Sequence, residues 1–300
     1  MLKITLPAFV VMLTVPAAAH AADQWQVGTA PTFSSGKYGT DSRTEVLHTP
    51  ISARRLFTNG DLTLVFPMTC IWGSTGITVV NGTPVRTERL QAAGTTTPTT
   101  TTRDTETTPS RTSTTTSTTR ATTDTTAVAP TTARVTTSSC GMGDIVVRGR
   151  YYIVDEHAWL PTVALRAHVK TPTADAERGL GTGRPDEGLG IEISRTFARG
   201  SMLMLDGGYT VIGQPAGADY DNNWWYDVGF GQNLGSDAVN LSVFFSEYRA
   251  IVPGLTNARD VLVALSVKGA SGWRIQISGE KGLSDGSPDH GITVGAARRF

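Results

Sequence analysis

The 300-residue sequence shows no excess of charge of either sign. Lys and Arg together number 26, Asp and Glu also number 26, and the formal net charge at pH 7 is +0. Proteins that bind nucleic acid carry a basic patch or a basic overall balance, and charge-driven binding to an anionic membrane surface needs a similar excess. We therefore expect no nucleic-acid partner and no attachment of that electrostatic kind.

Long hydrophobic runs are also missing after Ala21, because no stretch reaches the ~18 apolar residues of a transmembrane helix. The N-terminal segment has the basic residue Lys3, a short apolar stretch over residues 4–15, and Ala19-His20-Ala21 at its end. This order of parts is typical of a secretory signal peptide with its cleavage site. We expect residues 1–21 to be removed on export and residues 22–300 to form the mature protein.

Apolar residues at helical spacing are scarce after the signal peptide, and alternation with a period of two takes their place. In the C-terminal stretch, Ile292, Val294 and Phe300 fall on one face of a strand, and Thr293 and Arg299 on the other. The chain ends on Phe300, which we interpret as a membrane-insertion signature. This arrangement is typical of the closing strand of a bacterial outer-membrane β-barrel.

Further strands with the same alternation are expected at residues 25–33, 44–57, 62–72, 143–154, 160–170, 189–197, 203–211, 224–230, 239–246, 261–268 and 273–278. The connections between them are alternately short and long, like the periplasmic turns and external loops of outer-membrane barrels. The pattern predicts an all-β protein, a transmembrane antiparallel up-and-down β-barrel of about 12 strands. A soluble β-sandwich would have similar strands but does not predict this alternation of loop lengths.

Polar residues on the inner faces of these strands are the expected lining of the lumen. Charges of both signs that face one another across a narrow interior can pair, leaving a plugged core or a thin wet path. The candidates are Arg148, Arg150, Arg166, His168, Lys170, Glu192, Asp206, Asp227, Arg274 and Gln276.

Large apolar residues are almost absent from the segment at about 91–140, which is mostly Thr with scattered Ser, Arg, Pro and Asp. Such a segment cannot bury enough apolar surface to offset the entropy of ordering the chain. We expect a disordered insertion in the longest external loop of the barrel. The composition also resembles O-glycosylated stalks, but a tolerated low-complexity insertion is the simpler interpretation.

Cysteine occurs only as Cys70 and Cys140, at the external ends of consecutive strands on either side of the Thr-rich loop. In the oxidising environment outside the cytoplasm these two can form a disulfide that closes the base of the loop. The alternative is two unrelated thiols, and we favour the disulfide.

Motifs for a cofactor or a metal are weak. The glycine-rich stretch 179–183 lies between two strands, whereas a phosphate-binding loop needs a following helix, so we interpret it as a turn. Asp219, Asp221 and Asn223 have the first oxygen ligands of a calcium loop but lack its glycine and closing glutamate, and remain weak calcium candidates. We expect no cofactor and no bound metal.

Histidine residues that could serve a hydrolase are His48, His157, His168 and His290, and none shares a local motif with a Ser or an acidic residue. We therefore expect no enzyme and no catalytic residues. A barrel lipid hydrolase of the phospholipase or acyltransferase type is retained only as a less favoured interpretation.

Part of the sequence resembles a known family of outer-membrane proteins. The resemblance rests on Gly143-Asp144 before a strand, Leu160-Pro161 before a strand that ends Lys170-Thr-Pro-Thr173, the glycine-rich stretch 179–183 and Gly207-Gly208-Tyr209, with a looser fit at Pro50, Arg54, Leu64 and Pro67. These features look like the outer-membrane transporter family named after the MetA pathway of phenol degradation. The resemblance implies a transporting barrel without catalytic residues. The chain departs from the family pattern in its long insertion and at Arg298, where an apolar outward residue is expected.

The function expected from strands and resemblance together is an outer-membrane channel or transporter for small solutes, with aromatic or hydrophobic solutes implied by the family. The alternative is a non-conducting structural or surface-display barrel that presents the Thr-rich loop. Outer-membrane lipid, the barrel-assembly machinery during biogenesis and a small-molecule solute are the expected partners. The expected location is the outer membrane, after export by the signal peptide.

Overall fold

The structure is a computed structural model that describes residues 24–74, 76–80, 82–87 and 136–300. All of them belong to the same unit of the chain. Among these residues, no helix has the length and apolar character needed to cross a membrane. In chain order the elements are β1 (Gln24–Thr29), β2 (Thr32–Gly36), β3 (Thr44–Phe57), β4 (Gly60–Ser74), β5 (Ile77–Val80), β6 (Thr83–Arg86), β7 (Thr136–Met142), β8 (Val146–Val154), β9 (Thr162–Lys170), β10 (Asp186–Thr196), the 3-10 turn η1 (Ala198–Gly200), β11 (Ser201–Val211), β12 (Asn223–Asn233), β13 (Val239–Tyr248), β14 (Ala258–Lys268), the 3-10 turn η2 (Ala270–Gly272), β15 (Trp273–Gly282) and β16 (His290–Arg299).

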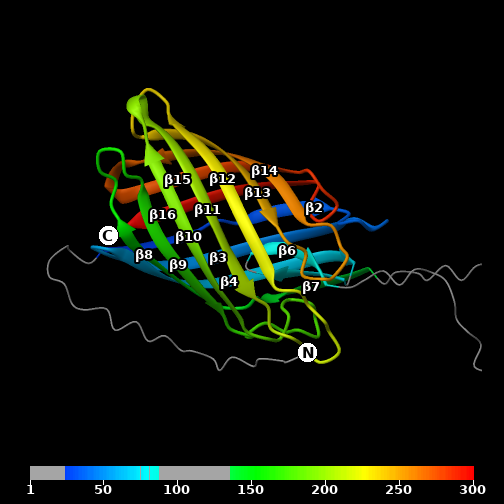
Figure 1. The fold of residues 1–300 in the computed structure, drawn as a ribbon. Helices are drawn as coiled ribbons and strands as arrows, with labels where there is room; N and C mark the ends of the chain where they lie inside the picture. The colour runs from blue at the N-terminus through cyan, green and yellow to red at the C-terminus, as the bar shows by residue number, and fades with distance from the viewer. Residues whose placement is uncertain (1–23, 75, 81, 88–135) are drawn as a thin grey trace, which may run out of the picture. The chain divides into compact units, whose positions relative to one another are not determined.

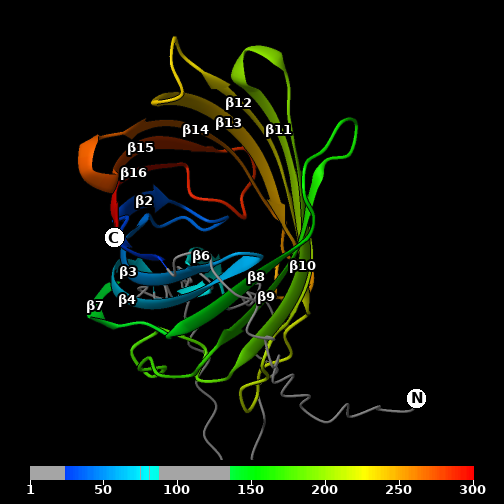
Figure 2. The same ribbon diagram turned by 90° about the vertical axis from the view of Figure 1, so that its left-hand side faces the viewer.

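All strands except β5 and β6 pair into one antiparallel sheet that closes on itself. β1 and β2 act as one strand of the wall, because both pair with β3 on one side and β16 on the other. β7 and β8 likewise both pair with β4. The wall is therefore a closed antiparallel barrel of 12 strands (Figures 1 and 2), and the predicted fold is confirmed.

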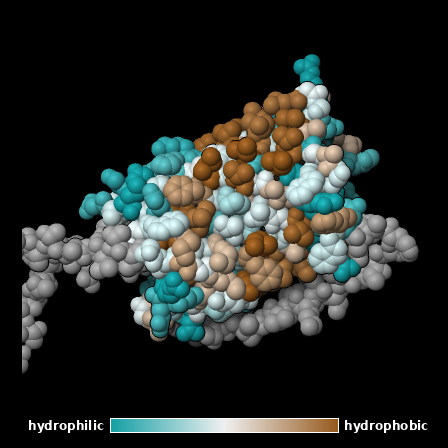
Figure 3. Space-filling model, turned by 180° about the vertical axis from the view of Figure 1, so that it is seen from behind, coloured by the Kyte–Doolittle hydropathy of each residue, from teal (hydrophilic) through white to brown (hydrophobic). Residues whose placement is uncertain are grey.

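Side chains alternate between the outer and inner faces of this wall, as the period-two pattern predicts. On β10, the side chains of Leu189 and Ile191 are 72% and 50% exposed on the outside. Glu192 points inward, where its carboxylate contacts Arg150 of β8. Figure 3 shows apolar side chains gathered on one face of the outer surface.

The outward residue Arg298 is accommodated by neighbouring aromatic rings. Its guanidinium carbon lies 5.7 Å from the ring centroid of Trp273 and 4.9 Å from that of Phe300. Across the seam, the Phe300 N–H donates to the Trp25 carbonyl (2.8 Å), and Arg55 lies 5.6 Å from the Trp25 ring. Cation–π contacts let these two cations sit among apolar neighbours at this edge of the barrel.

The connection from β4 to β8 differs from the sequence expectation in two places. Residues 136–140, assigned to the Thr-rich loop, belong to strand β7, and residues 77–86 form the β5–β6 hairpin. The run Thr-Thr-Ser-Ser before Cys140 has no apolar alternation, so only its pairing with β4 makes it a strand. The remainder of the Thr-rich loop and the signal peptide lie outside the described residues.

Cys70 of β4 and Cys140 of β7 face one another in the sheet register, with Cα atoms 4.0 Å apart, and are joined by a disulfide. This is the disulfide favoured from the sequence. The bond joins two residues that are 70 positions apart in the sequence.

Replacing both cysteines by Ala is expected to lower the free energy of unfolding in detergent by up to about 4 kcal/mol, because the disulfide restricts the entropy of a long unfolded loop. Denaturant titration of the purified barrel measures the change. Mass spectrometry of the non-reduced wild-type protein is the control, and two free thiols there would contradict the pairing.

Candidate functional site

The interior of the barrel contains two adjoining cavities, and both are lined by described residues. The larger has a volume of about 600 Å³ and the smaller about 220 Å³. Charged side chains lining the larger cavity are Arg54, Arg148, Arg150, Arg166, Lys170, Arg274, Asp61 and Asp144. The smaller cavity is lined by Arg148, Arg166, His168, Trp225, Asp227 and Tyr248, among others.

Arginine side chains on the inner faces of β8 and β9 form a basic surface. Arg150 stands directly opposite Arg166 in the sheet register, and Arg148 stands opposite His168. Like charges in directly opposed positions destabilise a sheet unless other groups offset them. Arg54 of β3 lines the same cavity and extends this basic surface to a third strand.

Carboxylates from neighbouring strands offset part of this charge. Asp61 lies 2.5 Å from Arg54 and 4.0 Å from Arg150, and Arg150 also forms an ion pair with Glu192 at 3.2 Å. Arg166 forms an ion pair with Asp206 of β11. Arg150 and Arg166 line the larger cavity, whereas Glu192 and Asp206 line neither of the two cavities.

The inward-facing indole of Trp225 lies beside Arg166, whose guanidinium carbon is 5.5 Å from the ring centroid. Two glycines on the neighbouring strands leave room for this ring. A Cβ atom on Gly208 would lie 2.7 Å from Trp225 Cζ2, and one on Gly190 would lie 3.2 Å from the same atom. The bare backbone of β10 and β11 therefore provides the flat surface on which the indole rests.

Lys170 lies at the end of β9 in a buried ion cluster. Its Nζ is 2.9 Å from Asp144, 2.9 Å from Asp186 and 2.7 Å from Thr182 Oγ1. The Lys170 side chain is only 1% exposed. Both aspartates also accept backbone hydrogen bonds, from the N–H groups of residues 174 and 213. The cluster therefore ties two long connections to the end of the barrel.

The ten lumen candidates from the sequence all lie on the inner side of the wall. Arg148, Arg150, Arg166, Lys170, Arg274 and Gln276 line the larger cavity, His168 and Asp227 line the smaller one, and Glu192 and Asp206 pair with lining arginines. Sequence reasoning did not find Trp225, Tyr248 or Asp61, because strand alternation marks a face but not which of its residues border a cavity.

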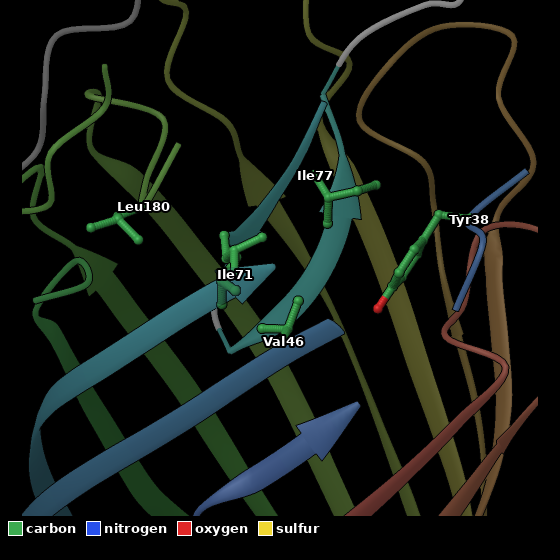
Figure 4. Packing of buried hydrophobic residues seen from close by; sticks show 6 residues of the cluster. Tyr38, Val46, Ile71, Ile77 and Leu180 are labelled. Atoms are coloured by element: carbon green, nitrogen blue, oxygen red, sulfur yellow. The ribbon is translucent and has the colours of Figure 1, made fainter. Parts of the chain in front are cut away.

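The β5–β6 hairpin lies inside the barrel near the long connections. Ile77 and Val79 pack against Tyr38, Val46 and Ile71, as Figure 4 shows for four of these residues. Burial raises the pKa of the Tyr38 phenol well above its usual range, so the ring contributes as a neutral group. The hairpin thus has one face in an apolar cluster with the strands β3 and β4.

The opposite face of the hairpin joins a second apolar cluster. Val80 packs there with Ile212, Ile251 and Val252, which lie in the connections after β11 and β13. Thr83 of the hairpin lines both cavities. Since it touches both sides of the interior, the hairpin narrows the lumen at this end. Asn81-Gly82 between two apolar runs is a strong hairpin signal and could have predicted it.

The weak calcium candidates are engaged in other contacts. Asp221 pairs with Arg249 at 2.8 Å, and the Asn223 side-chain amide donates to the Arg249 carbonyl at 2.5 Å. Within the described part of the chain, no group of three or more His, Cys, Asp or Glu residues is arranged to hold a metal ion.

Comparisons with known proteins agree with this architecture. A family model described as "Putative MetA-pathway of phenol degradation" matches residues 75–300. The crystal structure of an outer membrane channel from Pseudomonas putida F1 is similar with a TM-score of 0.58 and 11% identity, over 94% of this chain and 97% of that chain. Identity this low shows the barrel fold alone.

Two further structures are similar at lower scores. The translocator domain of the autotransporter NalP from Neisseria meningitidis has a TM-score of 0.43 and 9% identity, over 95% of this chain and 90% of that one. The toluene transporter TodX of P. putida has a TM-score of 0.42 and 9% identity, over 94% and 90%. A search of curated proteins found no significant match.

Replacing Lys170 by Met is expected to destabilise the barrel by roughly 3–5 kcal/mol, because it leaves Asp144 and Asp186 buried without their cation. Denaturant unfolding in detergent measures the loss. Lys268→Met, which removes the same charge at an exposed position, is the matched control and should change stability little. Equal stabilities for the two variants would contradict a structural role for the ion cluster.

Proposed function

Because this chain belongs to the family described as the putative MetA pathway of phenol degradation, as the match over residues 75–300 shows, we propose that its barrel is an outer-membrane channel for small solutes. The family description points to aromatic compounds among them. The observation that carries the proposal is the polar cavity of about 600 Å³ inside an apolar-surfaced barrel. A barrel with a purely structural role has no need of such a space.

The proposed location and orientation of the barrel follow from its apolar outer surface and from the lengths of its connections. A belt of apolar side chains around a sheet without free edges suits the hydrocarbon core of a bilayer. The short turns, such as the one at residues 58–59, belong on the periplasmic side, and the long connections face outward. In this orientation residues 1–21 direct export, outer-membrane lipid surrounds the wall, and the barrel-assembly machinery inserts it.

The hairpin β5–β6 acts as the constriction of the proposed channel. Its two apolar clusters hold it across the external half of the lumen. A solute would have to pass between the hairpin and the wall or displace the hairpin. We therefore infer that the channel is narrow and that movement of this hairpin sets its conductance.

A second candidate function is a non-conducting barrel that displays the Thr-rich loop. The same hairpin favours it, because a lumen narrowed by two apolar clusters carries little current. The two functions differ in conductance and uptake, and lipid turnover in the same preparation would reveal the hydrolase alternative.

Purified wild-type barrel in planar bilayers is expected to show small single-channel currents, and Ile77→Asp is expected to increase them several-fold. The charge in the apolar cluster costs several kcal/mol unless the hairpin leaves its place. Leu283→Asp, which adds the same charge at an exposed position in an outer connection, is the control and should conduct like the wild type. Absence of current and of liposome uptake in all three proteins would support the display function instead.

Cell fractionation is expected to recover the protein in the outer membrane, and mass spectrometry is expected to find Ala22 as its first residue. Protease added to intact cells should cut within residues 91–135 and leave the barrel in the membrane. A soluble periplasmic protein, or a chain that retains residues 1–21, would contradict the proposed location.

A further inference from the structure

Arg148 and Arg166 line both cavities and so lie where the two meet. On the side of the smaller cavity, the indole of Trp225 and the ring of Tyr248 are part of the same lining. Any solute that moves between the cavities must pass these two guanidinium groups and these rings. The junction is therefore the place in the lumen where charge and aromatic surface come together.

On the side of the larger cavity, the charge at this junction favours an anion. Six basic side chains line the larger cavity, against the two acidic side chains of Asp61 and Asp144. Asp61 already lies 2.5 Å from Arg54, and Asp144 lies 2.9 Å from Lys170. A bound anion would also reduce the repulsion between the opposed residues Arg150 and Arg166.

One carboxylate acts against this preference. Asp227 lines the smaller cavity and stands opposite Asp206 in the register of β11 and β12. Asp227 accepts a hydrogen bond from the Tyr248 hydroxyl at 3.3 Å, and Asp206 is paired with Arg166. Both carboxylates therefore have partners, and a cation would have to compete with the Tyr248 hydroxyl and with Arg166.

The size of the smaller cavity suits one aromatic ring. Its volume of about 220 Å³ exceeds the roughly 150 Å³ of an engineered protein cavity that holds benzene. A ring placed here can stack on the side of the Trp225 indole that lines the cavity, because the other side rests on the backbone at Gly190 and Gly208.

A neutral hydrocarbon is a poor match for the same site. It would remove water from the guanidinium groups of Arg148 and Arg166 without replacing the lost hydrogen bonds, which costs free energy. A carboxylate accepts two parallel hydrogen bonds from one guanidinium, and this charge-assisted geometry is the one that arginine provides.

We propose that the junction binds a small aromatic carboxylate, with the carboxylate at Arg148 and Arg166 and the ring on Trp225. This inference rests on the proposed channel function and names the class of its solute. The site distinguishes aromatic acids from neutral aromatic compounds by charge, and from aliphatic acids by stacking.

Equilibrium dialysis of radiolabelled benzoate against the purified, folded barrel in detergent tests the site without requiring transport. Benzoate is expected to bind at least tenfold more tightly than benzyl alcohol, acetate or benzylammonium. If the channel conducts nothing but benzoate binds in this order, the channel function fails and the site stands. If benzylammonium binds as tightly as benzoate, Asp227 dominates and the proposal is overturned.

Variants locate the binding on the named residues. Arg148→Gln and the charge-balanced double variant Arg166→Gln/Asp206→Asn should each weaken benzoate binding about tenfold or more, and Trp225→Leu should weaken benzoate but not acetate. Arg148→Lys, which keeps the charge without the bidentate geometry, should fall between wild type and Arg148→Gln. Arg43→Gln, which removes an exposed arginine paired with Asp289 outside both cavities, is the control.

Each variant is first shown to be folded by its β-sheet circular dichroism and its heat-modifiable migration. Wild-type affinity in folded Arg148→Gln and in the folded double variant would overturn the proposal. Loss of binding in Arg43→Gln as large as in the cavity variants would overturn it as well, because the effect would then not be local.

Discussion

Closure of the sheet is the constraint on which the other features of this protein depend. Inside a bilayer no water is present to satisfy an open backbone group, so every N–H and C=O of the wall needs a partner within the wall. The seam between β16 and the paired segments β1 and β2 removes the last free edge. Where the wall is interrupted, neighbours supply the bonds: Val294 N–H donates to the Pro31 carbonyl at 3.1 Å, and Gly143 N–H donates to the Pro67 carbonyl at 2.8 Å.

Closure also requires that charged side chains on the inner face of the wall form ion pairs. Because the outer face is apolar, the polar residues of each alternating strand lie on the inner face. Charged groups there are partly withdrawn from water, so they are costly unless they pair. Pairs such as Arg150 with Glu192 and Arg166 with Asp206 meet that requirement, while the guanidinium groups still face the cavities. The same strands thus provide both a stable wall and the proposed anion-selective surface.

The hairpin β5–β6 turns an open cylinder into a narrowed one. It is held by apolar side chains on both of its faces and by a hydrogen bond from the Thr78 hydroxyl to the Gly179 carbonyl in the connection after β9 (2.7 Å), and not by pairing with a strand of the wall. Apolar contacts of this kind are less directional than a hydrogen-bonded ladder, so a hairpin held by them can shift without opening the wall. The proposed channel therefore combines a rigid wall with one movable element inside it.

The sequence by itself determined the barrel, its number of strands and the side of each strand that faces inward, because period-two alternation and alternating loop lengths are local properties of the chain. It also marked Arg148, Arg166 and the two cysteines as residues of interest. Only the tertiary structure decided that Lys170 belongs to a buried ion cluster and that β7 and β8 together form one strand of the wall. It also decided that Trp225 lies beside Arg166, on the backbone surface that two glycines leave open. These features depend on the register between strands and on segments distant in sequence, and no local pattern records which residues face one another across a closed wall.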